Sequence, residues 1–537
     1  MEADRQPTAR IGEGSDLEGA CASGLPAGEV VEIKVRDGVS TAQDEQARCR
    51  ARGAALYKKL PHGPHGMDRS AVARNQRVRM YGAVIESVAG KGYAKTSVAD
   101  VIALAGVSRR AFYEHFANKE ACVIATHNIA ARRTSKAMLY GWESERGWAN
   151  RLHAACRAML TDIESHPKSS HLVMVDVLGL GRKAYDCVRA YNALFERSLV
   201  TGFVLSPDGA MCSPVAPRAI VGGVRHVLGA RIDTTRWKRI PGLTDELLDW
   251  IACCRTPAVE RLGGLPQQPP LPREQLGHPP RFLTGESRRA CAMRAIIDLT
   301  LEHGFEELTD PQVAHRAGMT TEAFHKQFRT KEQALLAVVE EFCAELRSAV
   351  VRAASQGSSW TEGVRLGMAA YIDCIARHPG VSRVAFVELF GVGAGAANHQ
   401  ASVSEAFTDF LADSGATPQR APTVALEALT GALWAVVGSS VASGRLRFLP
   451  ATLDHLTFTV LAPYTGPRAA IEAIEEAAGK TGARTIGGAR GAATSRSPAQ
   501  QPSPPSPPLR SLVREHAPEP ELLEDEVELS EGVPESA

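Results

Sequence analysis

An internal repeat constrains the fold of this 537-residue chain more than any other feature. Adding 212 to a position in the first half gives its counterpart in the second half, without a gap over the matched stretch. This unit is far longer than the repeat of a solenoid, so it predicts one globular domain present twice. The matched pairs include Gly92 and Gly304, Phe112 and Phe324, Phe116 and Phe328, Trp148 and Trp360, and Gly179 and Gly391.

The residue pattern within each copy predicts an all-α fold. Apolar residues recur at helical spacing from Val78 to Val88, and Gly92 follows as a C-terminal cap. Strand-favouring residues are modest in number, whereas Ala, Leu, Arg and Glu are abundant. We therefore expect two tandem domains, each with a helix-turn-helix in an N-terminal three-helix unit, followed by a helical ligand-binding and dimerisation bundle.

Composition shifts along the chain predict the domain boundaries. The proline density after residue 257 is incompatible with a continuing helix and favours an extended linker. The predicted parts are a flexible arm over 1–66, a first domain over 67–257 with its helix-turn-helix at about 74–120, a Pro-rich linker over 258–280, a second domain over 281–467 with its helix-turn-helix at about 286–332, and a disordered tail over 468–537.

Charge and hydropathy indicate a cytoplasmic protein. The net charge is +1, so any field that attracts nucleic acid must be local. The N-terminus lacks the apolar core of a signal peptide, and the eleven cysteines lack metal-binding spacing, which favours reduced thiols. Val424 to Ala442 resembles a membrane span, but Glu427 interrupts it. We expect it to be a buried helix whose partner is Ala219 to Ile232 of the first copy.

One motif in the first copy predicts a helix-turn-helix. Ser97, with Asp100 three residues later, is suited to cap a short helix. The turn Ala105-Gly106-Val107-Ser108 follows, in which glycine accepts a positive φ. Ser108 then caps a second helix over residues 109–116. Two short helices joined by such a turn are typical of DNA-binding domains.

The second helix of the motif presents groups that suit DNA. Arg109, Arg110, Tyr113 and His115 are the expected exposed positions, and all donate hydrogen bonds to base edges or phosphates. Lys119 suits a phosphate contact. Residues 69–119 carry nine Lys or Arg against three Asp or Glu, which is the local positive charge that the whole chain lacks.

The stretch GYAKTSVADVIALAGVSRRAFYEHFANKEA resembles the DNA-binding domain of the TetR (tetracycline-repressor) family. The resemblance implies an all-helical protein that dimerises through its last two helices, binds a double-stranded DNA operator and releases it when a small-molecule effector fills the second-half pocket. The DNA-contacting residues that it implies, with their counterparts in the second copy, are Ser97, Ser108, Arg109, Arg110, Tyr113, His115, Lys119, Thr309, Thr320, Thr321, His325, Lys326 and Lys331.

The second copy departs from this pattern at the reading positions. Glu322 replaces Arg110, His325 replaces Tyr113 and Gln327 replaces His115. Residues 286–331 carry seven basic and seven acidic side chains. Because a carboxylate that faces phosphate lowers affinity, we expect the first helix-turn-helix to be the main DNA reader, while the preserved framework keeps the second one folded.

The second half of each copy contains candidate effector contacts, although each of them is better suited to plain core packing. These are Trp148, Met159, His166, Met174 and Trp360. Catalytic triads, paired carboxylates, phosphate-binding loops and metal clusters at usable spacing are missing from the sequence. We therefore expect no enzymatic activity, no cofactor and no metal.

The sequence leaves three arrangements open. The two copies pair within one chain as a pseudo-dimer, or the chain forms a homodimer through one copy, or the protein is a ligand-sensing or protein-interaction module with weak or no DNA binding through the second copy. The leading interpretation is a small-molecule-responsive repressor in the cytoplasm, associated with the nucleoid. The effector, the operator and the regulated genes are not encoded in any readable motif.

Overall fold

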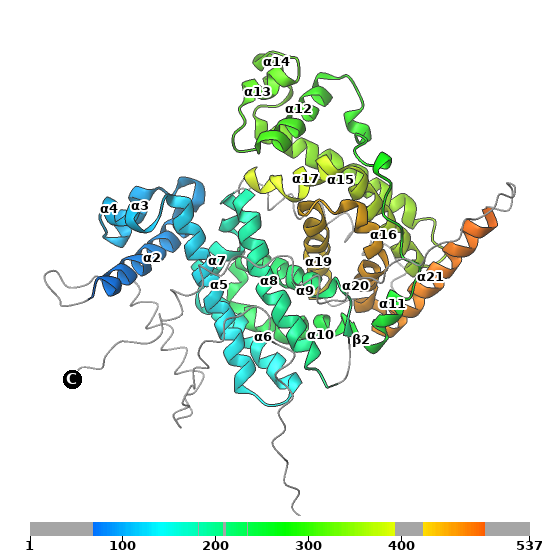
Figure 1. The fold of residues 1–537 in the computed structure, drawn as a ribbon, viewed down its shortest axis with the longest axis horizontal. Helices are drawn as coiled ribbons and strands as arrows, with labels where there is room; N and C mark the ends of the chain where they lie inside the picture. The colour runs from blue at the N-terminus through cyan, green and yellow to red at the C-terminus, as the bar shows by residue number, and fades with distance from the viewer. Residues whose placement is uncertain (1–67, 181, 208–210, 234, 393–422, 489–537) are drawn as a thin grey trace, which may run out of the picture. The chain divides into compact units, whose positions relative to one another are not determined.

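The computed structural model describes residues 68–180, 182–207, 211–233, 235–392 and 423–488 (Figure 1). The expected arm over 1–66 and the end of the expected tail lie outside these residues. The elements of the first copy are α2 (Arg69–Lys95), α3 (Val98–Ala105), α4 (Arg109–His115), α5 (Lys119–Ser144), α6 (Trp148–Ser165), α7 (Pro167–Met174), η1 (Asp176–Leu180), α8 (Arg182–Val204), β1 (Met211–Cys212), α9 (Ala216–Asp233), η2 (Thr235–Leu243), α10 (Thr244–Cys253), β2 (Arg255–Thr256), η3 (Pro257–Val259) and α11 (Glu260–Gly263).

The second copy repeats this order of helices. Its elements are η4 (Arg273–Gln275), η5 (Arg281–Leu283), α12 (Arg288–His303), α13 (Asp310–Arg316), α14 (Thr321–Gln327), α15 (Lys331–Ala354), α16 (Trp360–Arg377), α17 (Pro379–Phe386), η6 (Glu388–Val392), α19 (Thr423–Ala442), η7 (Leu446–Thr452), α20 (Leu453–Thr465) and α21 (Pro467–Gly488). The all-α prediction is confirmed, with β1 and β2 forming a two-residue antiparallel pair.

The 212-residue register predicted from the sequence holds in the helix boundaries. The helices α4 and α14, α6 and α16, and α7 and α17 begin and end at positions that differ by 212, and so do η1 and η6. Beyond residues 393–422 the difference becomes 209, because α10 begins at Thr244 and α20 at Leu453. The second copy is therefore three residues shorter between η6 and α19.

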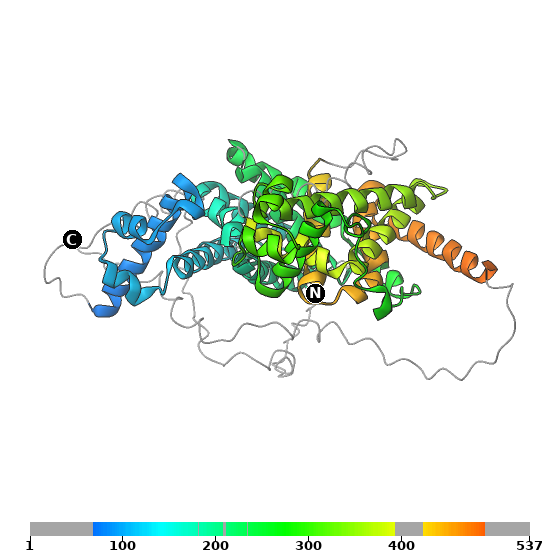
Figure 2. The same cartoon turned by 90° about the horizontal axis from the view of Figure 1, so that it is seen from above.

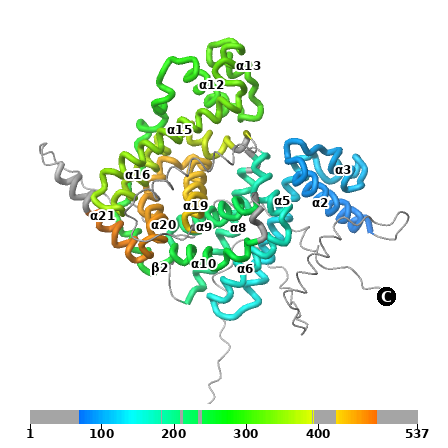
Figure 3. The backbone as a smooth tube through the Cα atoms, turned by 180° about the vertical axis from the view of Figure 1, so that it is seen from behind, coloured from blue at the N-terminus to red at the C-terminus, as the bar shows by residue number. Residues whose placement is uncertain are grey.

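The two copies meet where helices α9 and α19 lie side by side (Figures 1 and 3). Their backbones approach at Gly222 and Gly431, where a Cβ atom on either glycine would lie within 2.6 Å of the facing helix. These glycines are counterparts under the 209 register, and η1 also lies against its own counterpart η6. Contacts between equivalent positions are typical of a two-fold relation.

Polar contacts flank this glycine contact. Arg231 of α9 forms an ion pair with Glu427 of α19 at 2.8 Å. Arg218 donates to the Ser439 hydroxyl at 2.8 Å, and the Tyr185 hydroxyl donates to the Gly438 carbonyl at 3.2 Å. Glu427, which breaks the apolar run in the sequence, therefore has a cation opposite it. The expected pairing of Val424–Ala442 with Ala219–Ile232 is confirmed.

Helix α19 is long and apolar enough to cross a membrane, but 72% of the relevant stretch, Val424–Ala442, is buried inside the protein. Leu429, Leu433 and Val437 are each at most 2% exposed. Because its apolar surface is covered on all sides by the bundle, α19 has the character of a core helix.

The hydrophobic core has two parts. A small cluster around Met80, Val84 and Phe112 holds α2, α3 and α4 together and includes Leu172 of α7 and Val177 of η1. The large cluster contains the remainder of the first copy and the whole second copy, including Phe324 and Phe328 between α12 and α15. The N-terminal three-helix unit of the first copy thus has a core of its own, which α7 and η1 join to the rest.

The Pro-rich segment differs from the expected extended linker. It begins with the short helix α11, and its backbone then hydrogen-bonds to the second copy: Leu271 N donates to Arg447 O, and Gly277 N to Arg377 O, both at 2.9 Å. The reason is that the prolines are concentrated between residues 266 and 272, so the stretch before them is free to form a helical turn.

The predicted tail begins too early at residue 468, because helix α21 occupies the first part of that stretch (Figure 2, orange). Pro467 opens the helix, as proline does at a first helical position. Ala470, Ile471 and Ile474 are at most 1% exposed and pack into the core, and Arg261 of α11 pairs with Glu475. An apolar face of only a few residues is sufficient to hold this helix against the core. Such a short face is easily missed in an Ala- and Glu-rich sequence.

We expect Gly222→Ala to destabilise the protein and Gly229→Ala, on the same helix, to stabilise it. An added methyl at Gly222 would lie 2.3 Å from the Ala435 Cβ, so α9 and α19 must separate, which costs about 1–3 kcal/mol. At Gly229 nothing lies within 4 Å, and alanine gains about 0.5–1 kcal/mol in a helix. Thermal unfolding of both variants measures this; equal shifts in the unfolding midpoint would contradict the close packing.

Candidate nucleic-acid interface

In the first copy, helices α3 and α4 have the caps that the sequence predicts. The Ser97 hydroxyl accepts from Asp100 N, and the Asp100 carboxylate accepts from Ser97 N at 2.8 Å, which forms a capping box. Gly106 ends α3 with φ 60°, and Ser108 starts α4 by accepting from Ala111 N at 3.0 Å. These bonds fix the angle between the two helices. They confirm the predicted helix-turn-helix.

Aromatic side chains hold α4 against α2. Phe112 is fully buried and Phe116 nearly so, with ring centroids 5.8 Å apart, and Tyr81 of α2 packs on Phe116 at 5.9 Å. Phe324 and Phe328 repeat this pair in the second copy at 6.0 Å. The core positions of both motifs therefore match, as the sequence predicts, and any difference in function must come from the exposed side chains.

The outer face of α4 carries three exposed side chains that donate hydrogen bonds. The Arg110 side chain is 89% exposed and forms an ion pair with Glu114 at 2.9 Å. Because this pair is at the surface, water or a DNA phosphate can replace Glu114 as the partner of Arg110. The Arg109 guanidinium lies 5.9 Å from the Tyr113 ring, and Tyr113 is 47% exposed. These three side chains form the face that we call the α4 face.

His115 lies beside this face rather than on it. It is only half-buried, and its Nε2 lies 3.1 Å from the Gln76 Oε1 of α2. Burial and the nearby Arg77 charge lower its pKa, so the ring is neutral near pH 7. The expectation that His115 is an exposed position is therefore wrong, because Gln76 of α2 lies against this end of α4.

Lys119 and Lys331 point inward. The Lys119 ammonium donates to the Tyr93 carbonyl at 3.1 Å and lies 4.0 Å from the Tyr93 ring centre. Lys331 donates to three carbonyls in the turn between α12 and α13, those of Phe305, Glu306 and Leu308. An ammonium has three donors, so Lys331 has none left for phosphate in this structure, and the role expected from the sequence is replaced by one in holding the turn.

The capping hydroxyls divide into two pairs. Ser97 and Thr309 donate their own protons to the side chains of Asp100 and Gln312 within their capping boxes. Ser108 and Thr320 accept a helix N–H, which leaves the hydroxyl proton available to an outside acceptor. The N-termini of α4 and α14 therefore keep a donor that suits phosphate, whereas those of α3 and α13 do not.

The outer face of α14 differs in charge from the α4 face. Glu322 and Lys326 pair with each other at 2.9 Å and are 80% and 69% exposed, while Thr321 is partly buried. His325, in the place of Tyr113, lies 2.9 Å from the Asp310 carboxylate. The Lys326 charge thus has the Glu322 carboxylate beside it, and these two charges on the face cancel.

Matched windows give the same contrast. Residues 69–119 carry nine Lys or Arg against three Asp or Glu, whereas residues 281–331 carry eight against seven. On α13, Arg316 is paired with Glu302 of α12 at 2.6 Å. The first helix-turn-helix is therefore positively charged and the second is not.

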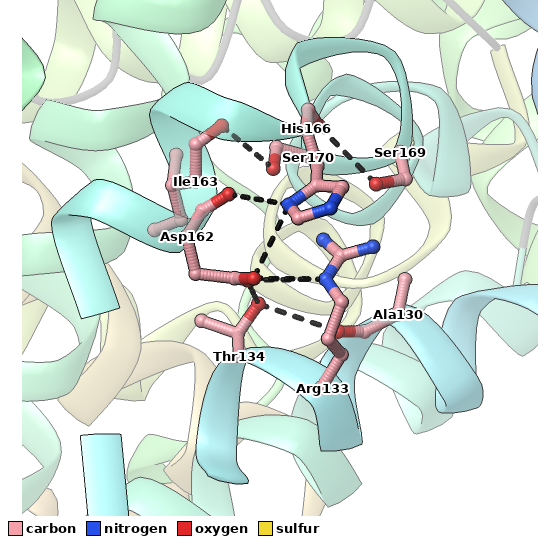
Figure 4. Close-up of polar contacts among 8 residues, drawn as sticks. All are labelled: Ala130, Arg133, Thr134, Asp162, Ile163, His166, Ser169 and Ser170. Atoms are coloured by element: carbon pink, nitrogen blue, oxygen red, sulfur yellow. Dashed lines mark hydrogen bonds and ion pairs between the residues drawn. The ribbon is translucent and has the colours of Figure 1, made fainter. Parts of the chain in front are cut away.

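The effector candidates from the sequence have ordinary partners. Trp148 donates to Gly202 O at 2.6 Å, Trp360 packs on the Tyr464 ring at 5.3 Å, and Met159 and Met174 are buried in the core. His166 belongs to a network around Asp162 (Figure 4). Four of these residues lie in the first copy, on α6, on α7 and at the junction between them, and Trp360 lies on α16 of the second copy.

Asp162 is the centre of that network. It accepts from Arg133 Nε at 3.0 Å and from the Thr134 hydroxyl at 2.8 Å, and His166 Nδ1 lies 3.2 Å away (Figure 4). Burial alone would raise the pKa of Asp162, but the contacts from His166 and Arg133 hold it below its usual value. The network ties α5 to α6 and ends at the His166–Pro167 junction where α7 begins.

Sequence reasoning missed three polar residues in the same bundle: His127 of α5, Tyr191 of α8 and Arg225 of α9. The available signal was Arg225 itself, a charged residue within the apolar run AIVGGVRHVLGA, at a position where the second copy has Trp434.

Within the described ranges, no three His, Cys, Asp or Glu side chains gather in a way that would hold a metal ion.

Comparison with known proteins agrees with this geometry. The family model described as "Bacterial regulatory proteins, tetR family" matches twice, at residues 83–126 and 293–338. Each match begins within the first helix of a three-helix unit and extends into the helix after the motif, α5 or α15. No curated protein matches the chain.

We expect Lys331→Met to loosen the second helix-turn-helix. Three carbonyls lose their donor, which costs about 1–3 kcal/mol. Lys326→Met is the matched control, because it removes only an exposed i,i+4 pair worth up to about 0.5 kcal/mol. Hydrogen exchange of the α12–α14 amides measures the local opening in both variants. Equal protection in the two variants would restore Lys331 to the candidate phosphate contacts.

Proposed function

From its two tandem DNA-binding domains of the tetR family of bacterial regulatory proteins, we propose that the chain is an asymmetric, single-chain repressor. In this proposal the first helix-turn-helix is the main DNA reader. Regulators of this family bind operator DNA and are not enzymes. The finer points, namely repression, release by a small molecule and the unequal use of the two copies, constitute the proposal.

One observation supports the unequal use of the two copies. The two recognition helices have the same caps and buried phenylalanines, but their exposed side chains differ. The α4 face offers Arg109, Arg110 and Tyr113, with the Ser108 hydroxyl at the start of the helix. Arginine is suited to bidentate hydrogen bonding with guanine in the major groove, and the hydroxyls with phosphate. On α14, Glu322 replaces Arg110, and a carboxylate that faces phosphate opposes binding.

The contact between α9 and α19 supports a pseudo-dimer within one chain. It joins equivalent positions of the two copies, and α10 and α20 lie beside it. In the family that the sequence resembles, helices near the end of each bundle serve dimerisation. Two recognition helices related in this way read half-sites about one DNA turn apart. Because their side chains differ, the operator should be non-palindromic.

A second candidate function follows from the α14 surface. The charges of Glu322 and Lys326 neutralise each other, and His325 lies 2.9 Å from the Asp310 carboxylate, as they would on a face that does not touch DNA. In this alternative, the second copy is a ligand-sensing or protein-interaction module, and DNA is held by the first copy alone. The two proposals differ in whether the second half-site is protected.

Selection of genomic fragments with the purified full chain identifies the operator, and footprinting then shows its symmetry. We expect Arg110→Ala to weaken specific binding by about 1–3 kcal/mol and to relax the preference at one base pair. Arg468→Ala is the control, since Arg468 is equally exposed and has the same i,i+4 pair on α21. If both variants bind normally, the α4 face is not the reader.

Salt dependence separates phosphate contacts from base contacts. We expect the slope of log K against log salt to become shallower by about 1 in Arg109→Ala, which removes one phosphate-neutralising charge. In Glu322→Ala we expect an unchanged or stronger non-specific affinity, because a repulsive charge is lost. Equal losses from Arg109→Ala and from Glu322→Ala on a perfect palindrome would show that both copies read DNA alike.

A further inference from the structure

Arg225 lies in the middle of the first bundle, where α9 passes the end of α7. Its Nη2 donates to the carbonyls of Val173 and Met174 at 2.9 and 3.2 Å, and its Nη1 lies 3.5 Å from the Met174 sulfur. Within the described part of the chain, no carboxylate pairs with this guanidinium. Burial lowers its pKa to about 10, so it remains charged near pH 7.

Two further polar side chains point to the same place. The Tyr191 ring centre lies 5.9 Å from the Arg225 guanidinium and 6.0 Å from the His127 ring. His127 is fully buried, its Nδ1 lies 3.2 Å from the Asn128 Oδ1, and its Nε2 has no hydrogen-bond partner. Burial lowers the pKa of His127 to about 4, so the ring is neutral and retains one open hydrogen-bonding position.

Arg225 is partly buried, and a cation withdrawn from water without an anionic partner is unfavourable unless something compensates it. Capping the last carbonyls of α7 is one structural role for Arg225, since arginine suits a helix C-terminus. That role accounts for Nη2 alone. Under this capping role, Nη1 faces only the Met174 sulfur, which is a weak acceptor. The role also gives no partner to His127 Nε2.

The second copy shows that the fold does not need this polar group. The counterpart of Arg225 is Trp434, whose ring lies 4.4 Å from that of Phe386, the counterpart of Met174. The counterpart of His127 is Val339, which is 1% exposed. The same junction of helices is therefore closed by apolar packing in one copy and by an unneutralised cation in the other.

We propose that the first copy alone binds an organic carboxylate, which Arg225 neutralises and His127 and Tyr191 contact, whereas Trp434 fills the equivalent site of the second copy. This inference rests on the proposed function and names the chemical class and the copy for its effector. The ligand has an apolar body, because the Phe195 ring packs on the Tyr191 ring at 4.6 Å and Met174 lies against the Arg225 guanidinium. Methionine side chains are flexible, so Met174 is the group that the carboxylate displaces.

The site is placed to act on the first helix-turn-helix. Arg225 holds the carbonyls at the end of α7, and Leu172 of α7 and Val177 of η1 belong to the core of the N-terminal unit. Lys168 of α7 also forms an ion pair with Glu86 of α2. A carboxylate that draws the Arg225 guanidinium away from Val173 and Met174 releases the end of α7. The contacts that α7 makes with α2 are then loosened as well.

The test uses the full chain without DNA and four probes: benzoate and octanoate, with benzamide and octanamide as their neutral analogues. Calorimetric titration should show that a carboxylate binds at least about tenfold more tightly than its amide. In Arg225→Gln this preference should disappear. Arg218→Gln, seven residues earlier on α9 and paired with Glu196 at the surface, is the matched control and should keep it.

The outcomes separate this inference from the proposed function. Circular dichroism confirms that Arg225→Gln is folded, and Arg225→Lys, which keeps the charge, should retain part of the preference. Equal binding of carboxylates and amides, unchanged binding in Arg225→Gln, or no binding of any probe overturns the inference, while DNA binding measured without ligand still stands. Carboxylate binding by a chain that selects no operator would instead overturn the proposed function.

Discussion

The backbone contact between Gly222 and Gly431 is the constraint on which the arrangement of the two copies depends. Helices α9 and α19 approach so closely there that neither position has room for a methyl group. This approach buries the apolar surface of α19, which would otherwise need a membrane or a second chain as its partner. Because the two glycines are counterparts, one contact positions both bundles and the α10–α20 pair beside them.

A covalent pair of this kind does not need two identical halves. The structure preserves what each half needs to fold: the capping residues, the turn glycines, the buried phenylalanines and the inward lysines. It differs at the two places where function is expected. On the recognition helices, Arg110 of the first copy is replaced by Glu322 in the second. Within the bundles, Arg225 is replaced by Trp434. One copy has the charges that suit DNA and an anionic ligand, and the other has an acidic replacement on the recognition helix and an apolar one within the bundle.

Much of this could be predicted from the sequence, because local patterns determine it. The capping box at Ser97, the positive φ at Gly106 and the buried pair Phe112–Phe116 follow from spacing alone, and the apolar run Val424–Ala442 required a partner. The lysine roles could not be predicted, since a long side chain is equally suited to phosphate and to carbonyls that only the tertiary fold brings near it. The Arg225 site was missed because its residues come from four separate helices.

The mass of the protein–operator complex tests the central claim most directly. A pseudo-dimer places both recognition helices on DNA from one chain, so sedimentation equilibrium on the selected operator should give one chain of 57.4 kDa for each DNA duplex. Footprinting of the same complex should show two unequal half-sites. Two chains on each operator, with equal protection of two identical half-sites, would contradict the account and show that the chain dimerises through a different surface.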